Sequence, residues 1–186
     1  MGGQSGSLGA VVSAPSCAAN SACLWIYQHG AISWTPGSGA VATSGEIGDL
    51  WLANKDALGR PLAAQATVTD PNGNGLAQSF ERGWIHAGPS GTYWSPTSVM
   101  TAYSARGWLR GALGWPSSDY ACGGAGGQCI QWFDGGAITG PKSGPMSSLD
   151  DNLMAAYRSV GGENGSFGFP LAAVQSVTDP NGNGLA

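Results

Sequence analysis

Apolar positions in this chain come in short alternating runs that are separated by glycine- and proline-rich segments. The stretch 66–69 is rich in β-branched residues, and two Asn-Gly steps at 72–75 follow it, which is typical of a β-hairpin turn. A second strand is predicted through 80–85. After a Pro/Gly/Ser loop, helical spacing predicts a helix, best defined over 148–160. The basic unit is therefore expected to be a hairpin followed by a helix.

The predicted helix over 148–160 begins at Ser148 as its N-cap and ends at the glycine pair 161–162. Its expected apolar face consists of Leu149, Leu153, Tyr157 and Val160. Counterparts of this helix are expected near 46–57 and 97–110.

The chain also repeats itself. Val68–Ala77 is VTDPNGNGLA, and Val177–Ala186 has the same ten residues. Turns that follow an L-G-x-P pattern, the first of them degenerate, recur at Leu8, Leu58, Leu113 and Phe167. The last three begin 55 and 54 residues apart. Such a period indicates tandem units that must stack to bury their apolar sides.

A second marker, aromatic-x-x-Gly-x-Ile, keeps the same spacing at 27–32, 80–85 and 133–138. Together the markers predict a flexible segment (1–7), three repeats (8–57, 58–112 and 113–166) and the start of a truncated fourth repeat (167–186). We therefore expect an α+β fold of tandem β-hairpin–helix repeats of about 50–55 residues. The repeats should stack in a curved or pseudo-symmetric array.

The four cysteines form two close pairs, Cys17/Cys23 and Cys122/Cys129. Their spacings do not fit a zinc site, and the two histidines are not placed to complete one. Two short-range disulfides are the favoured interpretation, and they imply an oxidising compartment. The cysteine pairs and the DPNGNG loops occupy the same position in alternate repeats.

Only 10% of the residues are charged, and the formal net charge is −4. Nucleic-acid binding normally needs a basic surface, so this class of function is not expected, and neutral partners such as polysaccharides fit better. No apolar run reaches the roughly 18 residues of a membrane-spanning helix, so membrane insertion is not expected either.

Residues 70–81 contain a pattern that is compatible with a calcium-binding loop. Asp70, Asn72, Asn74 and Glu81 fall at four ligand positions of an EF-hand-like loop. However, β-branched residues rather than an amphipathic helix precede this loop, and only Asp70 and Glu81 carry negative charge. A hairpin turn is the favoured interpretation. No cofactor is expected, and calcium stays open as an alternative.

Catalysis has little support in the sequence. No G-x-S-x-G, H-E-x-x-H or P-loop motif occurs. The sequence gives His29 and His86 neither a nucleophile nor an orienting carboxylate. Asp150-Asp151 open a predicted helix, where acidic side chains favour the helix dipole. We therefore expect no enzyme activity.

Eight tryptophans are many for 186 residues, and their flat rings suit both cores and sugar stacking. Trp51 and Trp115 are expected in the core. Trp34, Tyr93 and Trp94 follow the Gly-x-Ile marker among small polar residues, in a segment predicted to be an exposed loop. The candidate ligand contacts are Trp34, Tyr93, Trp94 and His86.

With its markers aligned, the chain resembles the LGFP repeat family over about residues 8–186. The resemblance rests on the turns at Leu58, Leu113 and Phe167 and on the Phe-Asp-Gly-Gly-Ala-Ile run from Phe133. It implies a secreted module, often attached to cell-wall enzymes of actinobacteria, that anchors to envelope polysaccharide. The first turn departs from the pattern because it is Leu-Gly-Ala-Val, and the paired cysteines are not part of the basic family pattern.

These observations together predict a non-catalytic, extracellular or cell-wall-associated module. Its expected partner is wall polysaccharide of the arabinogalactan or peptidoglycan type, to which it would target an attached enzyme. A structural or adhesive repeat domain that binds proteins, in one version stabilised by calcium, is the alternative. The chain ends near Ala186 in a strand that lacks a predicted partner, so self-association through the truncated repeat is also expected.

Overall fold

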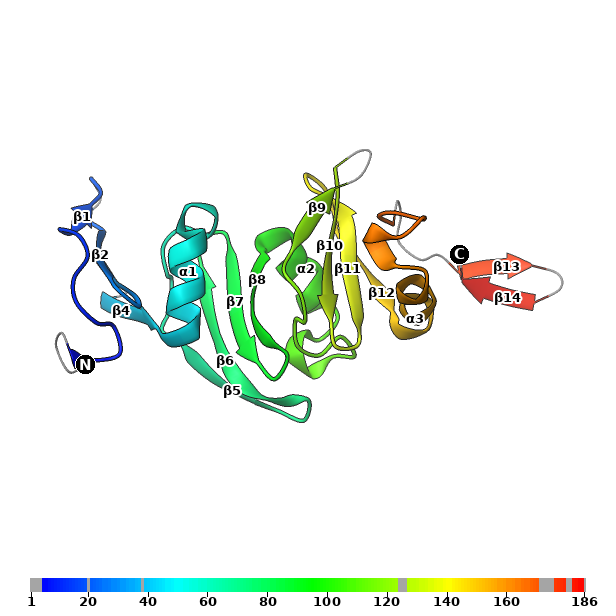
Figure 1. Cartoon of the computed structure of the whole chain (residues 1–186), viewed down its shortest axis with the longest axis horizontal. Helices are drawn as coiled ribbons and strands as arrows, with labels where there is room; N and C mark the ends of the chain where they lie inside the picture. The colour runs from blue at the N-terminus through cyan, green and yellow to red at the C-terminus, as the bar shows by residue number, and fades with distance from the viewer. Residues whose placement is uncertain are drawn as a thin grey trace. The chain divides into compact units, whose positions relative to one another are not determined.

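The computed structural model describes residues 5–19, 21–37, 39–123, 127–170, 176–179 and 182–185. Within these ranges the strands form three four-stranded antiparallel sheets and one two-stranded sheet, and three α-helices accompany them (Figure 1). The chain divides into two compact units, Met1–Thr97 and Ser98–Ala186. The mixed α+β class is confirmed. None of the described helices is long and apolar enough to cross a membrane.

The strands of each four-stranded sheet lie side by side in chain order. Sheet 1 contains β1 (Ser16–Cys17), β2 (Cys23–Tyr27), β3 (Gly30–Thr35) and β4 (Gly39–Ser44). Sheet 2 contains β5 (Ala66–Asp70), β6 (Gly73–Phe80), β7 (Gly83–Gly88) and β8 (Gly91–Pro96). Sheet 3 contains β9 (Ala121–Gly123), β10 (Gln128–Phe133), β11 (Gly136–Pro141) and β12 (Ser147–Asp150).

Four strands in each sheet correct the prediction of a two-stranded hairpin. The aromatic-x-x-Gly-x-Ile marker was expected inside one strand, but it forms the tight turn between the second and third strands, where Phe80 pairs with Gly83. The marker glycine is required because the fourth strand passes very close to it. A Cβ atom on this glycine would collide with a main-chain carbonyl oxygen of that strand, as seen for Gly30, Gly83 and Gly136.

The helices lie close to their predicted places. Helix α1 (Gly45–Leu58) ends at Gly59, whose φ of 76° suits glycine. Helix α2 (Thr97–Ala105) is shorter than expected because Gly107 adopts a left-handed conformation with φ of 86°. A short 3₁₀ turn, η2 (Trp108–Arg110), follows it.

Helix α3 (Asp151–Ser159) begins three residues later than predicted and is followed by the 3₁₀ turn η3 (Gly162–Asn164). Ser148 and Leu149 belong to β12 instead, so Ser148 is not the N-cap. The predicted apolar face was wrong, because Leu153 and Val160 are exposed whereas Met154 is buried.

The three sheets share one pattern of main-chain hydrogen bonds between the L-G-x-P turn and the marker. The amide that follows the marker's aromatic residue donates to the third residue of the turn, and the next amide donates to the first residue. The first set is Gln28 to Ala10 (3.0 Å), Glu81 to Arg60 (3.0 Å) and Asp134 to Trp115 (2.9 Å). The second set is His29 to Leu8 (3.0 Å), Arg82 to Leu58 (2.9 Å) and Gly135 to Leu113 (2.9 Å).

Each helix also makes the same side-chain bond to the turn that follows it. The Trp51 Nε1–H donates to the Gly59 carbonyl at 2.9 Å, and the Tyr157 hydroxyl donates to the Gly168 carbonyl at 2.6 Å. The Tyr103 hydroxyl donates to the Gly114 carbonyl. An indole and two phenols therefore form the same link between helix and turn.

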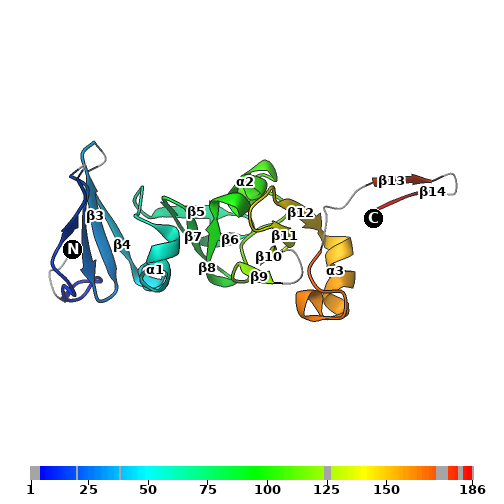
Figure 2. The same ribbon diagram turned by 90° about the horizontal axis from the view of Figure 1, so that it is seen from above.

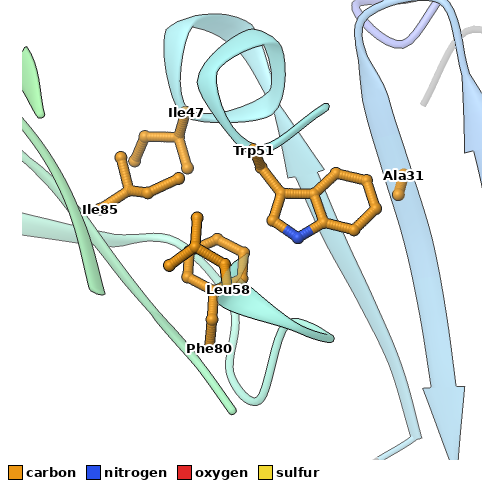
Figure 3. Packing of buried hydrophobic residues seen from close by; sticks show 6 residues of the cluster. All are labelled: Ala31, Ile47, Trp51, Leu58, Phe80 and Ile85. Carbon is orange, nitrogen blue, oxygen red and sulfur yellow. The ribbon is translucent and has the colours of Figure 1, made fainter. Parts of the chain in front are cut away.

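In the first unit, α1 packs against both sheet 1 and sheet 2 (Figure 2). Figure 3 shows Trp51 pointing towards Ala31 of sheet 1, while Ile47 lies beside Ile85 of sheet 2. All four side chains are buried, as Trp51 was predicted to be. One helix therefore buries apolar surface from two sheets at once.

In the second unit, sheet 3 is covered on both faces. On one face, the ring of Tyr103 from α2 lies 4.6 Å from the ring of Phe133. On the other face, Met154 of α3 forms a core cluster with Ile130, Ala137 and Leu149. Trp115 is fully buried, as predicted.

Near the end of the chain, β13 (Ser176–Asp179) pairs antiparallel with β14 (Gly182–Leu185). The expectation of an unpaired strand there was wrong, because β13 and β14 pair with each other. Ala186 and residues 1–4 of the expected flexible segment lie outside the described residues.

Candidate functional site

The side of sheet 1 that points away from α1 is called here the outer face. Ala31 and Leu24 pack towards α1, so strand alternation directs their neighbours in β2 and β3 the opposite way. The outer face consists of Cys17, Cys23, Trp25, Tyr27, Ile32, Trp34, Ala40 and Ala42. It is aromatic in its centre and carries no charged side chain.

Burial distinguishes this face from its equivalent in sheet 3, which α2 covers. The strand registers place Cys23, Trp25, Tyr27 and Ile32 at the same positions as Cys129, Gln131, Phe133 and Ile138. All four residues of sheet 3 are 0% exposed, whereas all four residues of sheet 1 are partly exposed. Trp34 is 38% exposed. Among the described residues, no helix covers the outer face of sheet 1.

Residue size also differs between the open and covered faces. Trp25 stands where sheets 2 and 3 have Gln78 and Gln131, and Trp34 stands where they have Ala87 and Gly140. The two glutamines are buried, and each donates to a main-chain carbonyl: Gln78 to Ala63 at 2.9 Å and Gln131 to Ser118 at 3.1 Å. Indole rings therefore replace small or hydrogen-bonded residues on the open face only.

A disulfide closes the hairpin beside the outer face. Cys17 and Cys23 are paired residues of β1 and β2 with an S–S distance of 2.04 Å, and Cys23 lies opposite Trp34. Cys122 and Cys129 form the second disulfide, at 2.02 Å, in the same place in sheet 3. Both predicted disulfides are confirmed. In sheet 2 the pair Thr67 and Leu76 occupies this place, below the DPNGNG turn.

The predicted ligand contacts lie on strands rather than in a loop. Trp34 is in β3, whereas Tyr93 and Trp94 are neighbours in β8 and therefore point to opposite faces of sheet 2. Trp94 packs against the core around α1, and the Tyr93 hydroxyl donates to the Ser90 carbonyl at 3.2 Å. The structure does not bring Trp34 together with Tyr93 and Trp94, because they belong to different sheets.

His86 is buried in β7, where its ring stacks with Trp84 at a centroid distance of 6.1 Å. Burial lowers the pKa of His86 to about 3, because the charged imidazolium would lose its water. The ring is therefore neutral at physiological pH. Its burial corrects the expectation of a direct ligand contact.

The four residues considered for calcium do not form an EF-hand-like loop. The Asp70 carboxylate accepts a bond from the Asn72 amide at 2.9 Å, which is an Asx turn at the tip of the hairpin. Glu81 lies beyond the other end of β6, about 24 Å away at the usual rise per residue. There its carboxylate accepts from the Arg60 amide at 3.1 Å, as Gln28 does from Ala10 at 3.0 Å in sheet 1.

Acidic, histidine and cysteine side chains do not gather elsewhere into a metal site. Throughout the described ranges, no group of three or more of these residues could hold a metal ion. His29 Nδ1 lies 3.4 Å from Asp49 Oδ1, but both side chains are well exposed to solvent. Water screens such a pair strongly.

The sequence analysis did not select Trp25 or Tyr27 as candidate ligand contacts, and Tyr27 was treated only as part of the marker. The available signal was alternation, since Trp25 and Tyr27 are two residues apart, as are Ile32 and Trp34. When every second residue of two paired strands is aromatic or apolar, those residues lie on the same face of the sheet.

Comparison with known families gives a match in the same region. The family model for the LGFP repeat matches residues 8–56. This segment is therefore similar to an LGFP repeat. The match confirms the resemblance in the segment that forms sheet 1 and most of α1, even though its turn is the degenerate Leu-Gly-Ala-Val. The outer face therefore lies entirely within the LGFP repeat. A search of curated proteins found no significant match.

Proposed function

We propose that this protein is a non-catalytic, extracellular module that binds cell-wall polysaccharide and holds an attached enzyme at the wall. The observation that carries the proposal is an uncharged, aromatic surface left open within the LGFP repeat. Trp34 is its most exposed large side chain. Aromatic rings with one polar edge suit ligands that combine apolar ring faces with hydroxyl groups.

The two disulfides support an extracellular location, because such bonds persist in oxidising compartments. The low charge supports a neutral partner rather than nucleic acid.

We further propose that 58–112 and 113–166 are copies of the LGFP repeat at 8–57, and that 167–186 begins a fourth. The recurring hydrogen bonds between marker and turn, together with the helix-to-glycine bond, support this interpretation.

A pull-down on insoluble wall polysaccharide, stripped of protein, tests the function. The disulfide-bonded protein is expected in the pellet, and a non-binding globular protein of similar size controls for trapping. Recovery of all the protein in the supernatant would contradict the proposal. Hydrolysis of the polysaccharide during incubation would contradict the non-catalytic assignment.

A structural or adhesive role is the second candidate. The exposed apolar residues Val11, Val12 and Phe167 favour it, because such side chains are common in protein contacts. Retention on wall proteins but not on the stripped polysaccharide would support this role.

A further inference from the structure

We propose that the outer face of sheet 1 is the binding site for the neutral polysaccharide, with Trp25, Tyr27 and Trp34 each stacking on a sugar unit. This inference rests on the proposed function and deepens it, because it names the site. It adds Trp25 and Tyr27 to the ligand contacts and separates them from Tyr93 and Trp94.

The geometry of the sheet places the three rings in a row. Trp25 and Tyr27 are two residues apart on β2, which corresponds to about 7 Å. Trp25 pairs with Ile32, so Trp34 is its diagonal neighbour on β3, at about 7–8 Å. Both strands lie in the middle of sheet 1, and the platform therefore has a sheet-like, flat base rather than a loop.

Comparison with sheets 2 and 3 indicates that the ligand of the outer face is not a helix packed as α1 and α2 are. Where α1 and α2 approach sheets 2 and 3, the positions of Trp34 are occupied by Ala87 and Gly140. A small residue there leaves room for a helix, whereas an indole fills that room.

The lack of charge on the outer face further restricts the class of ligand that it can bind. The eight residues of the outer face include no acid, base or histidine. A phosphate-rich or uronic-acid polymer would find no cation there, so a neutral glycan is the matching class. Its binding should depend little on salt, because screening weakens only charge–charge contacts.

The test is a titration of the intact protein with soluble, purified arabinogalactan. Binding is detected by intrinsic tryptophan fluorescence and by calorimetry. Wild type should bind equally at low and high salt. Trp34→Ser and Trp25→Ser should each weaken binding about tenfold, in line with the loss of one aromatic contact. Trp34→Tyr keeps a ring and should restore most of the affinity.

Phe167→Ser is the matched control, because it removes an even more exposed aromatic residue (75%) from the second unit. It should bind as wild type does. Thermal melting and circular dichroism of every variant separate lost binding from lost folding. If Trp34→Ser unfolds, the binding affinities of Trp34→Tyr and Trp34→Leu are compared instead. Trp34→Leu keeps an apolar side chain but no aromatic ring, so it should bind more weakly than Trp34→Tyr.

The outcomes distinguish site from function. If wild type binds and the Trp25 and Trp34 variants bind equally well, the site is wrong and the proposed function stands. If wild type binds no wall polysaccharide, both are overturned. If wild type sediments as an oligomer that Trp34→Ser converts to a monomer, the outer face belongs to a second copy and the site proposal is overturned.

Discussion

Sheets 1 and 3 have the same strand order, the same hydrogen bonds to the L-G-x-P turn and a disulfide at the same hairpin. They differ in what covers them. Within the part of the chain that the structure describes, sheet 3 has α2 on one face and α3 on the other, whereas sheet 1 has α1 on one face only. The uncovered face is also the one on which Trp25 and Trp34 replace the residues found elsewhere.

The difference shows how one repeat can serve two purposes. Backbone geometry is fixed by the turn and the marker glycine, so it does not depend on the outward-facing side chains. Those side chains can therefore be chosen for helix packing in one copy and for another partner in the next. Four predictions follow the comparison from its largest expected effect to its smallest.

The largest effect should come from truncating equivalent isoleucines. Ile138→Ala should lower the free energy of unfolding by about 2–5 kcal/mol, because it opens a cavity in a fully buried site. Ile32→Ala, on the open face, should cost about 1 kcal/mol or less because water fills the space. Urea unfolding followed by circular dichroism measures both, and equal losses would mean that the outer face is covered in solution.

A third disulfide should form in sheet 2. Thr67→Cys combined with Leu76→Cys places cysteines where sheets 1 and 3 have theirs. The closed loop should add about 2–3 kcal/mol to the free energy of unfolding. Mass spectrometry after alkylation tests the bond, and the single variants serve as controls. Free thiols at both positions would show that the three hairpins are not equivalent.

The hydrogen bond between helix and turn should contribute less to the free energy of unfolding than a buried core side chain does, but its contribution should still be measurable. Tyr103→Phe leaves the Gly114 carbonyl without its buried donor and should cost about 1–3 kcal/mol. Tyr93→Phe removes an exposed bond to Ser90 and should cost less than about 0.5 kcal/mol. If the two variants unfold at the same urea concentration, the shared bond does not stabilise the repeat.

The smallest effect, taken per pH unit, is a pH dependence from the buried His86, which stands where sheet 3 has Thr139. The pKa of His86 is about 3 in the folded protein and about 6.5 in the unfolded chain, so below pH 6.5 the unfolded chain binds the extra proton. Stability should therefore fall as the pH decreases from 6.5 towards 3, by at most about 1.4 kcal/mol per unit.

Urea unfolding at pH 7, 6 and 5 measures this slope above the range in which most carboxylates titrate. His86→Thr should flatten it. An unchanged slope in His86→Thr would show that other groups cause it.

Much of the architecture could be predicted because it is local. The repeated turn at Leu58 and Leu113, the glycine of each marker and the close cysteine spacing all act over short stretches of chain. Patterns of this kind are visible in a single sequence. They placed the two disulfides and the buried Trp51 and Trp115 correctly.

The missed features depend on contacts between distant segments. β8 begins with Gly and ends with Pro, and β12 ends with Asp, three residues that are depleted in strands, so both segments resembled loops. They become strands because β7 and β11 offer them a paired edge. For the same reason Leu149 appeared to continue a helix, and Trp34 appeared to lie in a loop.

Helix α1 packs on the sheet that follows it as well as on its own, and the first compact unit accordingly ends at Thr97, after β8. The boundary between the sequence repeats, at Leu58, therefore does not coincide with the boundary of the first compact unit, at Thr97. Expression fragments cut just before an L-G-x-P motif would strip a sheet of the helix that precedes it and expose its isoleucine to water. A fragment that ends at Thr97, after β8, keeps α1 together with the two sheets that it covers.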